Sequence, residues 1–387
     1  MKAIVFFAAL AASFAALAET VVDVTGKGAE KITVSVDVSG AKSFSDSLKR
    51  NLDLTGGFMV MKLPSQAAVK VSGRVGGEIK VEGNGKVLTL PSSAADDKAA
   101  RREARRLADK MAGTYLGMKG FASDPFVFVL KKGLVSELCE GYPDGFDLRQ
   151  LTSAGKTVVG PRWNGLSTVF YTAIINAGPQ IYQYDMATGQ SSRKWSFRGL
   201  ATGAAVSPDG KHAAVILSIH GNPELYVIDM AANTWKRLTN TPFASEGQPS
   251  WSPDGTKIAY VSDESRRPHI YVVDVATKKS FRVTSSGQQN VDPDWGPDGR
   301  IVFISKRNGE GKIATVDPAK GASSLQMVET PGTWEHPSWS RDGRHVVATS
   351  GDRIFIVDTF PKSEGGDKPK QAFSAAGKWI TPSWRRQ

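Results

Sequence analysis

Three related stretches of the sequence decide its fold: Pro249–Gly255 (PSWSPDG), Pro293–Gly299 (PDWGPDG) and Pro337–Gly343 (PSWSRDG). Their tryptophans are 44 residues apart, and weaker copies extend the series back to Trp163 and forward to Trp384. A fixed period in the low forties, with short apolar runs between turn signals, is typical of propeller blades, each of which is a four-stranded meander. The sequence therefore predicts a β-propeller.

One repeat shows the four strands of a blade. Strand A includes Gln248–Trp251, strand B is Lys257–Ser262, strand C is His269–Val275 and strand D is Ser280–Thr284. The Pro-Asp-Gly triplet suits the A–B turn, because Pro fixes φ, Asp bonds the following backbone and Gly accepts a positive φ. We expect the strand-A tryptophans to pack blade on blade rather than to form a ligand cage, because their period already explains them.

Counting the repeats predicts how the ring closes. Complete repeats begin near residues 158, 202, 247, 290 and 335, which makes five. Residues 126–152 supply only strands B, C and D, and residues 378–384 supply a lone strand A. Joined together, the two fragments make a sixth blade and leave no open sheet edge. We therefore predict a six-bladed propeller over residues 123–387, closed by strand 378–384.

The segment over residues 19–122 lacks this period. Phe44, Leu48 and Leu52 mark a helix that ends near Gly56, and Ala94–Met118 has the pattern of a long helix. Strands are expected at 20–24, 31–38, 58–63, 69–75, 78–82 and 87–90. The predicted fold class is thus mainly β, a six-bladed β-propeller preceded by a small α/β domain. The long helix has a basic face, formed by Lys98, Arg101, Arg102, Arg105, Arg106 and Lys110. This face is interpreted as a solvated surface or as a docking surface for an acidic protein or a lipid headgroup.

Residues 1–18 have the pattern of a secretory signal peptide. Lys2 precedes an uncharged apolar run that ends in Ala16-Leu17-Ala18, and the run is shorter than the ~20 residues that span a bilayer. We expect an exported, soluble mature chain with no transmembrane segment. One cysteine, Cys139, excludes an internal disulfide, which favours a bacterial periplasm, and we expect it to be a small core residue. The formal net charge of +11 permits anionic partners without specifying one.

An α/β domain followed by a propeller of W-S-P-D-G repeats resembles the TolB family, the periplasmic components of Tol–Pal systems. Asn51–Phe58 (NLDLTGGF), Gly117–Phe121 (GMKGF) and Tyr142–Gly145 (YPDG) also resemble family stretches. The compressed strand region at 65–90 and a strand A at 202–206 without Pro or Trp depart from the family pattern. The resemblance implies a non-catalytic protein that links a peptidoglycan-associated lipoprotein, Pal, to the inner-membrane protein TolA. Such a protein supports outer-membrane integrity and constriction at cell division.

The expected lipoprotein site is the funnel where the D–A and B–C connections emerge, since antiparallel order brings both to one end of the propeller. In TolB-like proteins the loop before strand A touches Pal, and Thr202, Gly203, Gly247 and Gln248 are the matching positions. The alternative is that these loops are simply solvated. The expected site residues are Thr202, Gly203, Glu246, Gly247, Gln248, Arg266, Arg267, Asn290, Asp292, Glu335, His336 and Thr381.

The mature amino terminus is expected to be a TolA-binding tail, formed by Glu19, Thr20, Val21, Val22, Asp23 and Val24. Its alternating β-branched residues suit addition as a strand to another protein's sheet edge. TolB-like proteins use this terminus to engage TolA. The alternative is that the stretch packs as an ordinary first strand of the α/β domain.

Some enzyme classes share such propellers, and each needs its own catalytic residues. It contains no G-x-S-x-G, the nucleophile motif of prolyl-oligopeptidase-type enzymes. A metal-dependent lyase would need histidine ligands, and only His220, His269 and His336 are expected at one end. We therefore expect no catalytic residue, no cofactor and no metal, in a monomer that does not bind nucleic acid. A glycan- or peptidoglycan-binding propeller is the main alternative, and a lyase is a weaker one.

Overall fold

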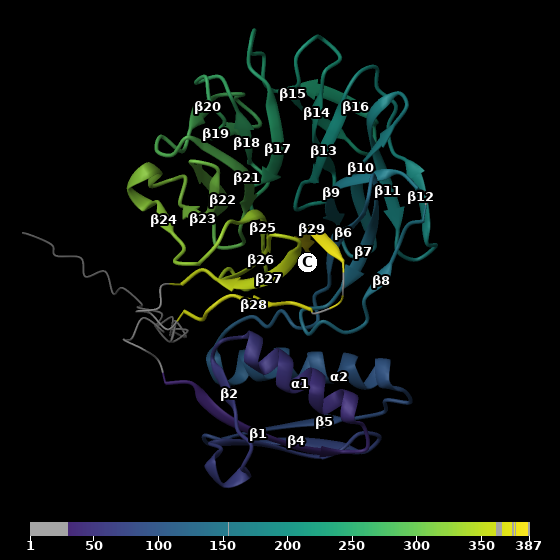
Figure 1. Ribbon diagram of the computed structural model, residues 1–387, viewed down its shortest axis with the longest axis vertical. Helices are drawn as coiled ribbons and strands as arrows, with labels where there is room; N and C mark the ends of the chain where they lie inside the picture. The colour runs from purple at the N-terminus through teal and green to yellow at the C-terminus, as the bar shows by residue number, and fades with distance from the viewer. Residues whose placement is uncertain (1–29, 154, 361–365, 374, 376, 386–387) are drawn as a thin grey trace, which may run out of the picture.

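The structure, a computed structural model, describes residues 30–153, 155–360, 366–373, 375 and 377–385. These residues form six four-stranded sheets arranged around a central channel, beside a separate domain with a five-stranded sheet and helices (Figure 1). The predicted fold class is confirmed. The signal peptide expected at residues 1–18 and the tail expected at Glu19–Val24 lie outside the described residues.

Each blade runs from an inner to an outer strand in the order A, B, C, D. The first complete blade contains β9 (Thr157–Asn164), β10 (Thr168–Ile175), β11 (Gly178–Asp185) and β12 (Gln190–Arg193). The next contains β13 (Ala201–Val206), β14 (His212–Leu217), β15 (Glu224–Asp229) and β16 (Thr234–Arg237). The third contains β17 (Glu246–Trp251), β18 (Lys257–Ser262), β19 (His269–Asp274) and β20 (Ser280–Arg282).

The remaining two complete blades follow the same order. One contains β21 (Gln289–Trp295), β22 (Ile301–Arg307), β23 (Glu310–Val316) and β24 (Gln326–Met327), with the short helix η3 (Gly321–Ser324) before its last strand. The other contains β25 (Glu335–Trp339), β26 (His345–Ser350), β27 (Arg353–Asp358) and β28 (Lys370–Gln371). All five begin within about a residue of the expected positions.

The last sheet joins the two ends of the propeller. It contains β29 (Lys378–Trp384), β6 (Phe126–Lys132), β7 (Val135–Gly141) and β8 (Arg149–Gln150), in that order. Strand β29 pairs antiparallel with β6, and the Trp384 indole Nε1 also donates to the carbonyl oxygen of Asp124 at 3.1 Å. Figure 1 shows the yellow β29 beside the blue-teal β6, although the two lie at opposite ends of the propeller sequence.

The tryptophans of strand A pack between blades, as predicted. Trp251 lies in a cluster with Ala214 of the preceding blade and Tyr260 of its own, and its Nε1 donates to the carbonyl oxygen of Ala205 at 2.9 Å. Trp339 and Trp384 are buried in equivalent clusters. Large aromatic side chains supply much of a core's burial energy, so the 44-residue period reflects the stacking of one blade on the next.

The amino-terminal domain places two helices between its sheet and the propeller (Figure 1). The sheet order is β2-β1-β3-β4-β5, in which β1 is parallel to both β2 and β3. Apolar side chains of both helices pack on the sheet in one cluster. The elements are β1 (Ile32–Ser39), α1 (Lys42–Leu54), β2 (Phe58–Val60), η1 (Pro64–Gln66), β3 (Val69–Arg74), β4 (Glu78–Gly83), β5 (Lys86–Pro91), α2 (Asp97–Met111) and η2 (Ala112–Leu116).

In the amino-terminal domain, helix α2 and strand β2 are shorter than predicted, for local reasons. Helix α2 begins at Asp97 rather than Ala94, because the Asp96 side chain caps it by accepting from the Ala99 backbone N–H at 2.7 Å. The helix then widens into the π-turn η2 and ends at Gly117, whose φ of 66° terminates it. Strand β2 ends at Val60, and Pro64 begins the short helix η1 soon after.

The basic face of α2 is not wholly solvated, which corrects one sequence interpretation. Arg105 is 2% exposed, and its guanidinium contacts Asp144 at 2.8 Å and Asp147 at 2.9 Å. Arg101 also binds Asp147, at 2.7 Å. The Arg105 guanidinium lies 3.8 Å from the centre of the Tyr142 ring. Both arginines therefore join α2 to the connection between β7 and β8 in the propeller.

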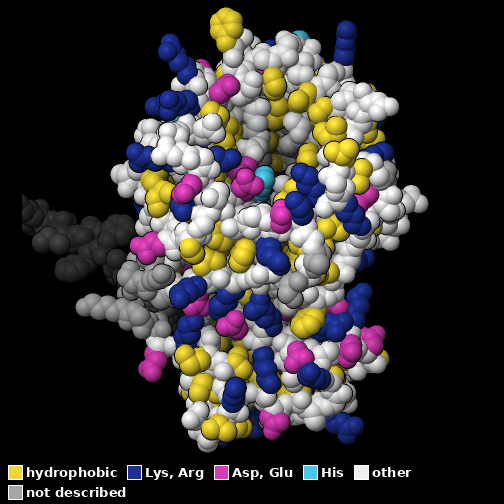
Figure 2. Space-filling view, in the orientation of Figure 1, with side chains coloured by type: hydrophobic (Ala, Val, Ile, Leu, Met, Phe, Trp, Pro, Cys, Tyr) yellow, Lys and Arg dark blue, Asp and Glu magenta, His cyan; other side chains and the backbone are white. Residues whose placement is uncertain are grey.

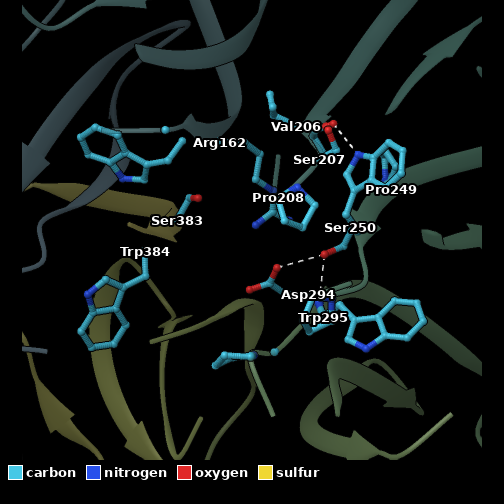
Figure 3. Close-up of a pocket in the computed structure, with 17 residues that line it drawn as sticks. Arg162, Val206, Ser207, Pro208, Pro249, Ser250, Asp294, Trp295, Ser383 and Trp384 are labelled. Carbon is cyan, nitrogen blue, oxygen red and sulfur yellow. Dashed lines mark hydrogen bonds between the residues drawn. The ribbon is translucent and has the colours of Figure 1, made fainter. Parts of the chain in front are cut away.

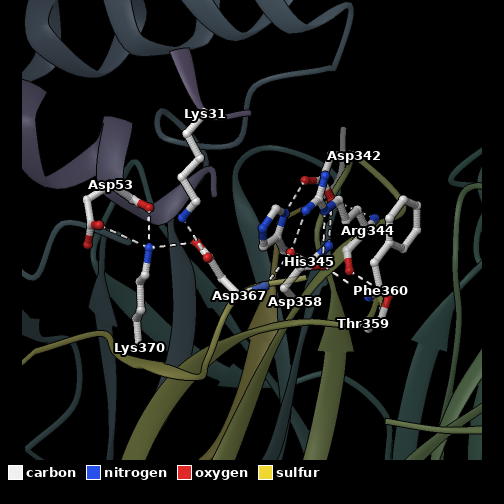
Figure 4. A network of polar contacts seen from close by, with 10 residues as sticks. All are labelled: Lys31, Asp53, Asp342, Arg344, His345, Asp358, Thr359, Phe360, Asp367 and Lys370. Atoms are coloured by element: carbon white, nitrogen blue, oxygen red, sulfur yellow. Dashed lines mark hydrogen bonds and ion pairs between the residues drawn. The ribbon is translucent and has the colours of Figure 1, made fainter. Parts of the chain in front are cut away.

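A second group of ion pairs joins the domains near β28 (Figure 4). Lys31 binds Asp367 at 2.6 Å, and Lys370 binds Asp367 at 2.9 Å and Asp53 of α1 at 3.0 Å. Beside them Arg344 pairs with Asp358 at 2.6 Å. These propeller groups lie on A–B or C–D connections or on the strand ends next to them, so the amino-terminal domain occupies the end of the propeller opposite the funnel.

Candidate functional site

The inner strand of every blade contains a β-bulge near the funnel. The pairing between strands A and B shifts register at the same place in all six sheets. One residue per bulge has a positive φ, between 50° and 69°. Such conformations are uncommon for residues other than glycine and are typical of positions that the surrounding structure holds in place. These residues form a ring around the channel, the bulge ring: Gly160, Gly203, Gln248, Asp292, His336 and Thr381.

Side chains link three members of this ring. The Gln248 amide donates to the Asp292 carboxylate, and the Asp292 backbone N–H donates back to Gln248 Oε1 at 2.9 Å. The His336 backbone N–H then donates to Asp292 Oδ2 at 3.1 Å. Gly160 and Gly203 contribute no side chain. The ring is therefore polar on one side of the channel and bare backbone on the other.

A second layer of residues lies deeper in the channel, where it lines a pocket of about 250 Å³ (Figure 3). Ser250 Oγ donates to Asp294 Oδ1 at 3.2 Å and accepts from the Trp295 backbone N–H at 2.9 Å. Asp294 Oδ2 in turn accepts from the Trp339 backbone N–H at 2.8 Å. Each contact joins one blade to the next. These side chains therefore stabilise the ring of blades around the channel.

The predicted funnel residues lie at different depths. Gln248, Arg266, Arg267 and Glu335 are exposed, whereas Thr202, Gly203, Gly247, His336 and Thr381 are half-buried. Glu246, Asn290 and Asp292 are buried. The Asn290 amide donates to the backbone oxygen of Ser286 at 2.7 Å and contacts His269 Nδ1 at 2.9 Å. The expected residues thus share one end of the propeller, but three of them hold loops instead of presenting side chains to solvent.

Glu246 belongs to a buried pair of carboxylates. Thr241 Oγ1 lies 3.2 Å from Glu246 Oε1 and 3.3 Å from Glu224 Oε1, and Ser262 Oγ donates to Glu246 at 3.1 Å. Burial and the neighbouring Glu224 raise the pKa of Glu246 to about 8. Arg237, 2.6 Å from Glu224, instead helps to keep the Glu224 pKa low against the effect of burial. Glu246 is therefore protonated at neutral pH, and it anchors the loop before β17.

Comparison with known proteins supplies the family. A model of the TolB beta propeller domain matches residues 114–385. The chain belongs to the TolB β-propeller family.

Individual relatives agree with this assignment. The Tol-Pal system protein TolB of Gluconobacter oxydans is 26% identical over 242 residues, which cover 55% of this chain and 53% of that protein. TolB of Rickettsia bellii is 26% identical over 36% of this chain and 31% of its own length. The chain thus spans about half the length, or less, of these curated relatives. The crystal structure of TolB from Acinetobacter baumannii shares the fold, with a TM-score of 0.79 at 21% identity, over 93% of this chain and 98% of that one.

One exposed aromatic residue on this TolB-family propeller was missed by sequence reasoning. Phe243 is 99% exposed, on the D–A loop that leads into β17. The Ser245 backbone N–H donates to Asp263 at 2.7 Å, which ties this loop to the B–C loop that carries Arg266 and Arg267. A lone aromatic residue in the loop stretch 240–245 (NTPFAS) is the signal that marks it in the sequence. Figure 2 shows a hollow in the propeller with acidic, basic and histidine side chains gathered around it.

The three histidines considered as lyase ligands have separate surroundings in the TolB-family fold. His220 contacts the Tyr226 hydroxyl at 2.9 Å, His269 contacts Thr284 Oγ1 at 3.3 Å, and His336 lies on the bulge ring. Over the described ranges, no group of three or more His, Cys, Asp or Glu residues is placed to hold a metal ion. Cys139 is buried in β7. None of the helices described has the length and apolar composition needed to cross a membrane.

Proposed function

We propose that this chain is a non-catalytic component of a Tol–Pal system and acts as a monomer in the periplasm. It links a Pal-type lipoprotein to a TolA-type inner-membrane protein, and so supports outer-membrane integrity and constriction at cell division. Its place in the TolB propeller family and the names of its curated relatives support this role.

The observation that carries the proposal is the funnel end of the propeller. There the exposed Gln248, Arg266, Arg267 and Glu335 surround the bulge ring, and Phe243 projects beside them. Aromatic and arginine side chains dominate the binding energy of most protein interfaces. We place the lipoprotein on this surface, with Thr202, Gly203, Gly247, His336 and Thr381 at its half-buried floor and Glu246, Asn290 and Asp292 holding its loops.

Calorimetric titration with the soluble domain of the Pal-type lipoprotein tests this assignment. Phe243→Ser is expected to weaken binding about tenfold or more, because a buried aromatic anchor contributes at least ~1–2 kcal/mol. Phe281→Ser is the matched control, since Phe281 is 47% exposed on the outer strand β20. Absence of lipoprotein binding by the unmodified chain would overturn the proposed function. Equal losses in the two variants would move the site away from the funnel.

The second partner is tested through the amino-terminal tail. We propose that Glu19–Val24 adds as a strand to a sheet edge of a TolA-type protein. A chain without residues 19–25 is expected to lose TolA binding and to keep its lipoprotein affinity. If TolA binds the shortened chain as well as the intact one, the tail is not the binding segment.

A further inference from the structure

Four basic side chains of α2 form a row on the surface of the molecule. Lys98, Arg102, Arg106 and Lys110 are all exposed and follow one another at four-residue intervals. Residues four apart lie on the same side of a helix, so the row runs along α2 for about 18 Å. Among the described residues, none of the four side chains has an ion-pair or hydrogen-bond partner.

The acidic groups near this row are already engaged elsewhere. Asp97 accepts from Ser43 Oγ at 2.7 Å, Glu103 accepts from Ser92 Oγ at 2.6 Å, and Asp109 accepts from the Ala122 backbone N–H at 2.7 Å. On the propeller side of the same helix, Asp144 and Asp147 are neutralised by Arg105 and Arg101. None of these carboxylates forms an ion pair with Lys98, Arg102, Arg106 or Lys110, so the four cations of the row remain unpaired among the described residues.

The row ends at a pocket of about 440 Å³ where α2 meets the propeller. Lys110, Lys119 and Arg341 line it, together with Asp109, Met118 and the glycines at 113, 117 and 120. Arg341 lies 3.4 Å from Asp124, whereas Lys110 and Lys119 form no ion pair within the described ranges. A Cβ added at Gly117 would meet no atom within 4 Å, so the backbone there is open to a ligand. The pocket is thus basic and accessible.

We propose that the row and the pocket together dock an anionic phospholipid surface, with one headgroup phosphate in the pocket. Protein interfaces are built around apolar and aromatic anchors, and none of the large hydrophobic residues exposed in the described chain lies on α2. A row of cations without such anchors matches a membrane surface, where each Lys or Arg contributes about fivefold in affinity, or ~1 kcal/mol. The surface lies at the propeller end opposite the funnel, and the proposal is independent of lipoprotein binding.

Vesicle co-sedimentation tests the proposal, with the chain that begins at Glu19. Phosphatidylcholine vesicles containing phosphatidylglycerol are expected to bind the protein at low salt and to release it at high salt. The triple variant R102Q/R106Q/K110Q is expected to bind about a hundredfold more weakly. The matched control K211Q/K236Q/K279Q removes three exposed propeller lysines and is expected to stay within about twofold of the unmodified chain.

Three outcomes would overturn the proposal. Equal losses in the two triple variants would mean that only net charge matters. Equal binding to pure phosphatidylcholine vesicles would mean that the protein does not recognise the negative charge of the lipid. Binding of inorganic phosphate or polyglutamate without vesicle binding would mean that the surface takes a free anion or an acidic protein. Melting temperature and lipoprotein affinity, measured in parallel, are expected to match the unmodified chain in both variants.

Discussion

The two ends of the propeller hold their buried carboxylates in opposite ways. At the domain end, which faces the amino-terminal domain, Asp144 and Asp147 contact guanidinium groups of α2, and Asp358 contacts Arg344. At the funnel end, Glu246 and Asp292 accept from hydroxyl, amide and backbone donors. At the domain end cations neutralise these carboxylates. At the funnel end Arg237 pairs with Glu224, whereas Glu246 and Asp292 form no ion pair with a Lys or Arg in the described chain.

The pKa values of the two ends record the same difference. Burial alone would raise the pKa of Asp147, but Arg101 and Arg105 hold it below its ordinary value. Burial and Glu224 raise the pKa of Glu246 to about 8. Nearby guanidinium groups therefore keep Asp147 ionised, whereas burial beside another carboxylate favours the protonated form of Glu246.

The largest effect is expected from opening the ring of blades, which disrupts the funnel end and the domain end of the propeller together. Deletion of residues 378–387 takes away β29 and exposes the partner edge of β6. It also removes the buried Trp379 and Trp384, each of which contributes on the order of 3–5 kcal/mol, so the loss is comparable to the whole stability of a domain. Calorimetry is expected to show no cooperative melting of the propeller. A chain lacking only residues 386–387 is the control, and melting of the longer deletion within a degree or two of that control would contradict the closure.

The second-largest effect is expected from a substitution at the domain end alone. Arg105→Met leaves Asp144 buried without its main cation and is expected to cost ~3–5 kcal/mol in urea unfolding. Arg102→Met, on the exposed side of the same helix, is expected to change stability by less than ~0.5 kcal/mol. Adding Asp144→Leu to Arg105→Met is expected to recover part of the loss. Equal stabilities of the two single variants would show that the buried pair does not hold the domains together.

A third prediction sharpens the contrast through pH. The Glu246 pKa rises on folding, so this group stabilises the protein most below the ordinary glutamate range and loses its contribution as the pH rises through about 8. Glu246→Gln is expected to flatten the fall in melting temperature between pH 6 and 9. Glu335→Gln, at the exposed first residue of β25 and so at the equivalent position of another blade, is expected to leave that fall unchanged. Parallel pH profiles for Glu246→Gln and the unmodified chain would rule out the protonated anchor.

The smallest effect concerns the partly exposed pair at the domain end. Lys31 and Asp367 are 30% and 18% exposed, so solvent screens their 2.6 Å contact (Figure 4). Lys31→Gln is expected to cost less than ~1 kcal/mol, as measured by urea unfolding, well below the effect of Arg105→Met. A larger loss from Lys31→Gln than from Arg105→Met would reverse the ranking of the two contacts.

The architecture of the propeller could be predicted because its signal is periodic. Tryptophans 44 residues apart mark the blades, and the two incomplete repeats pointed to the pairing of β29 with β6. The bulge ring had no such signal, since only Gly160 and Gly203 are glycines, while Gln248, Asp292 and His336 adopt the same left-handed conformation. There the blade geometry overrides residue preference.

The charges were harder to place than the strands. The helical pattern places Arg101 and Arg105 outside the core of their own domain, but it does not show that another domain covers them. A glutamate at the start of a strand is usually exposed, and Glu246 is buried because Thr241, Ser262 and Glu224 pack around it. Such pairings depend on tertiary contacts that local sequence patterns do not specify.

The pairing of β29 with β6 also sets the timing of folding. Phe126 and Trp384 are register partners although 258 residues separate them. A chain that enters its folding compartment amino terminus first presents the edge of β6 before β29 is available to pair with it. During that interval the edge is open to pairing with other chains, which makes aggregation compete with completion of the ring. A chaperone that covers the edge of β6 until β29 arrives would therefore raise the yield of folded protein without changing its final stability.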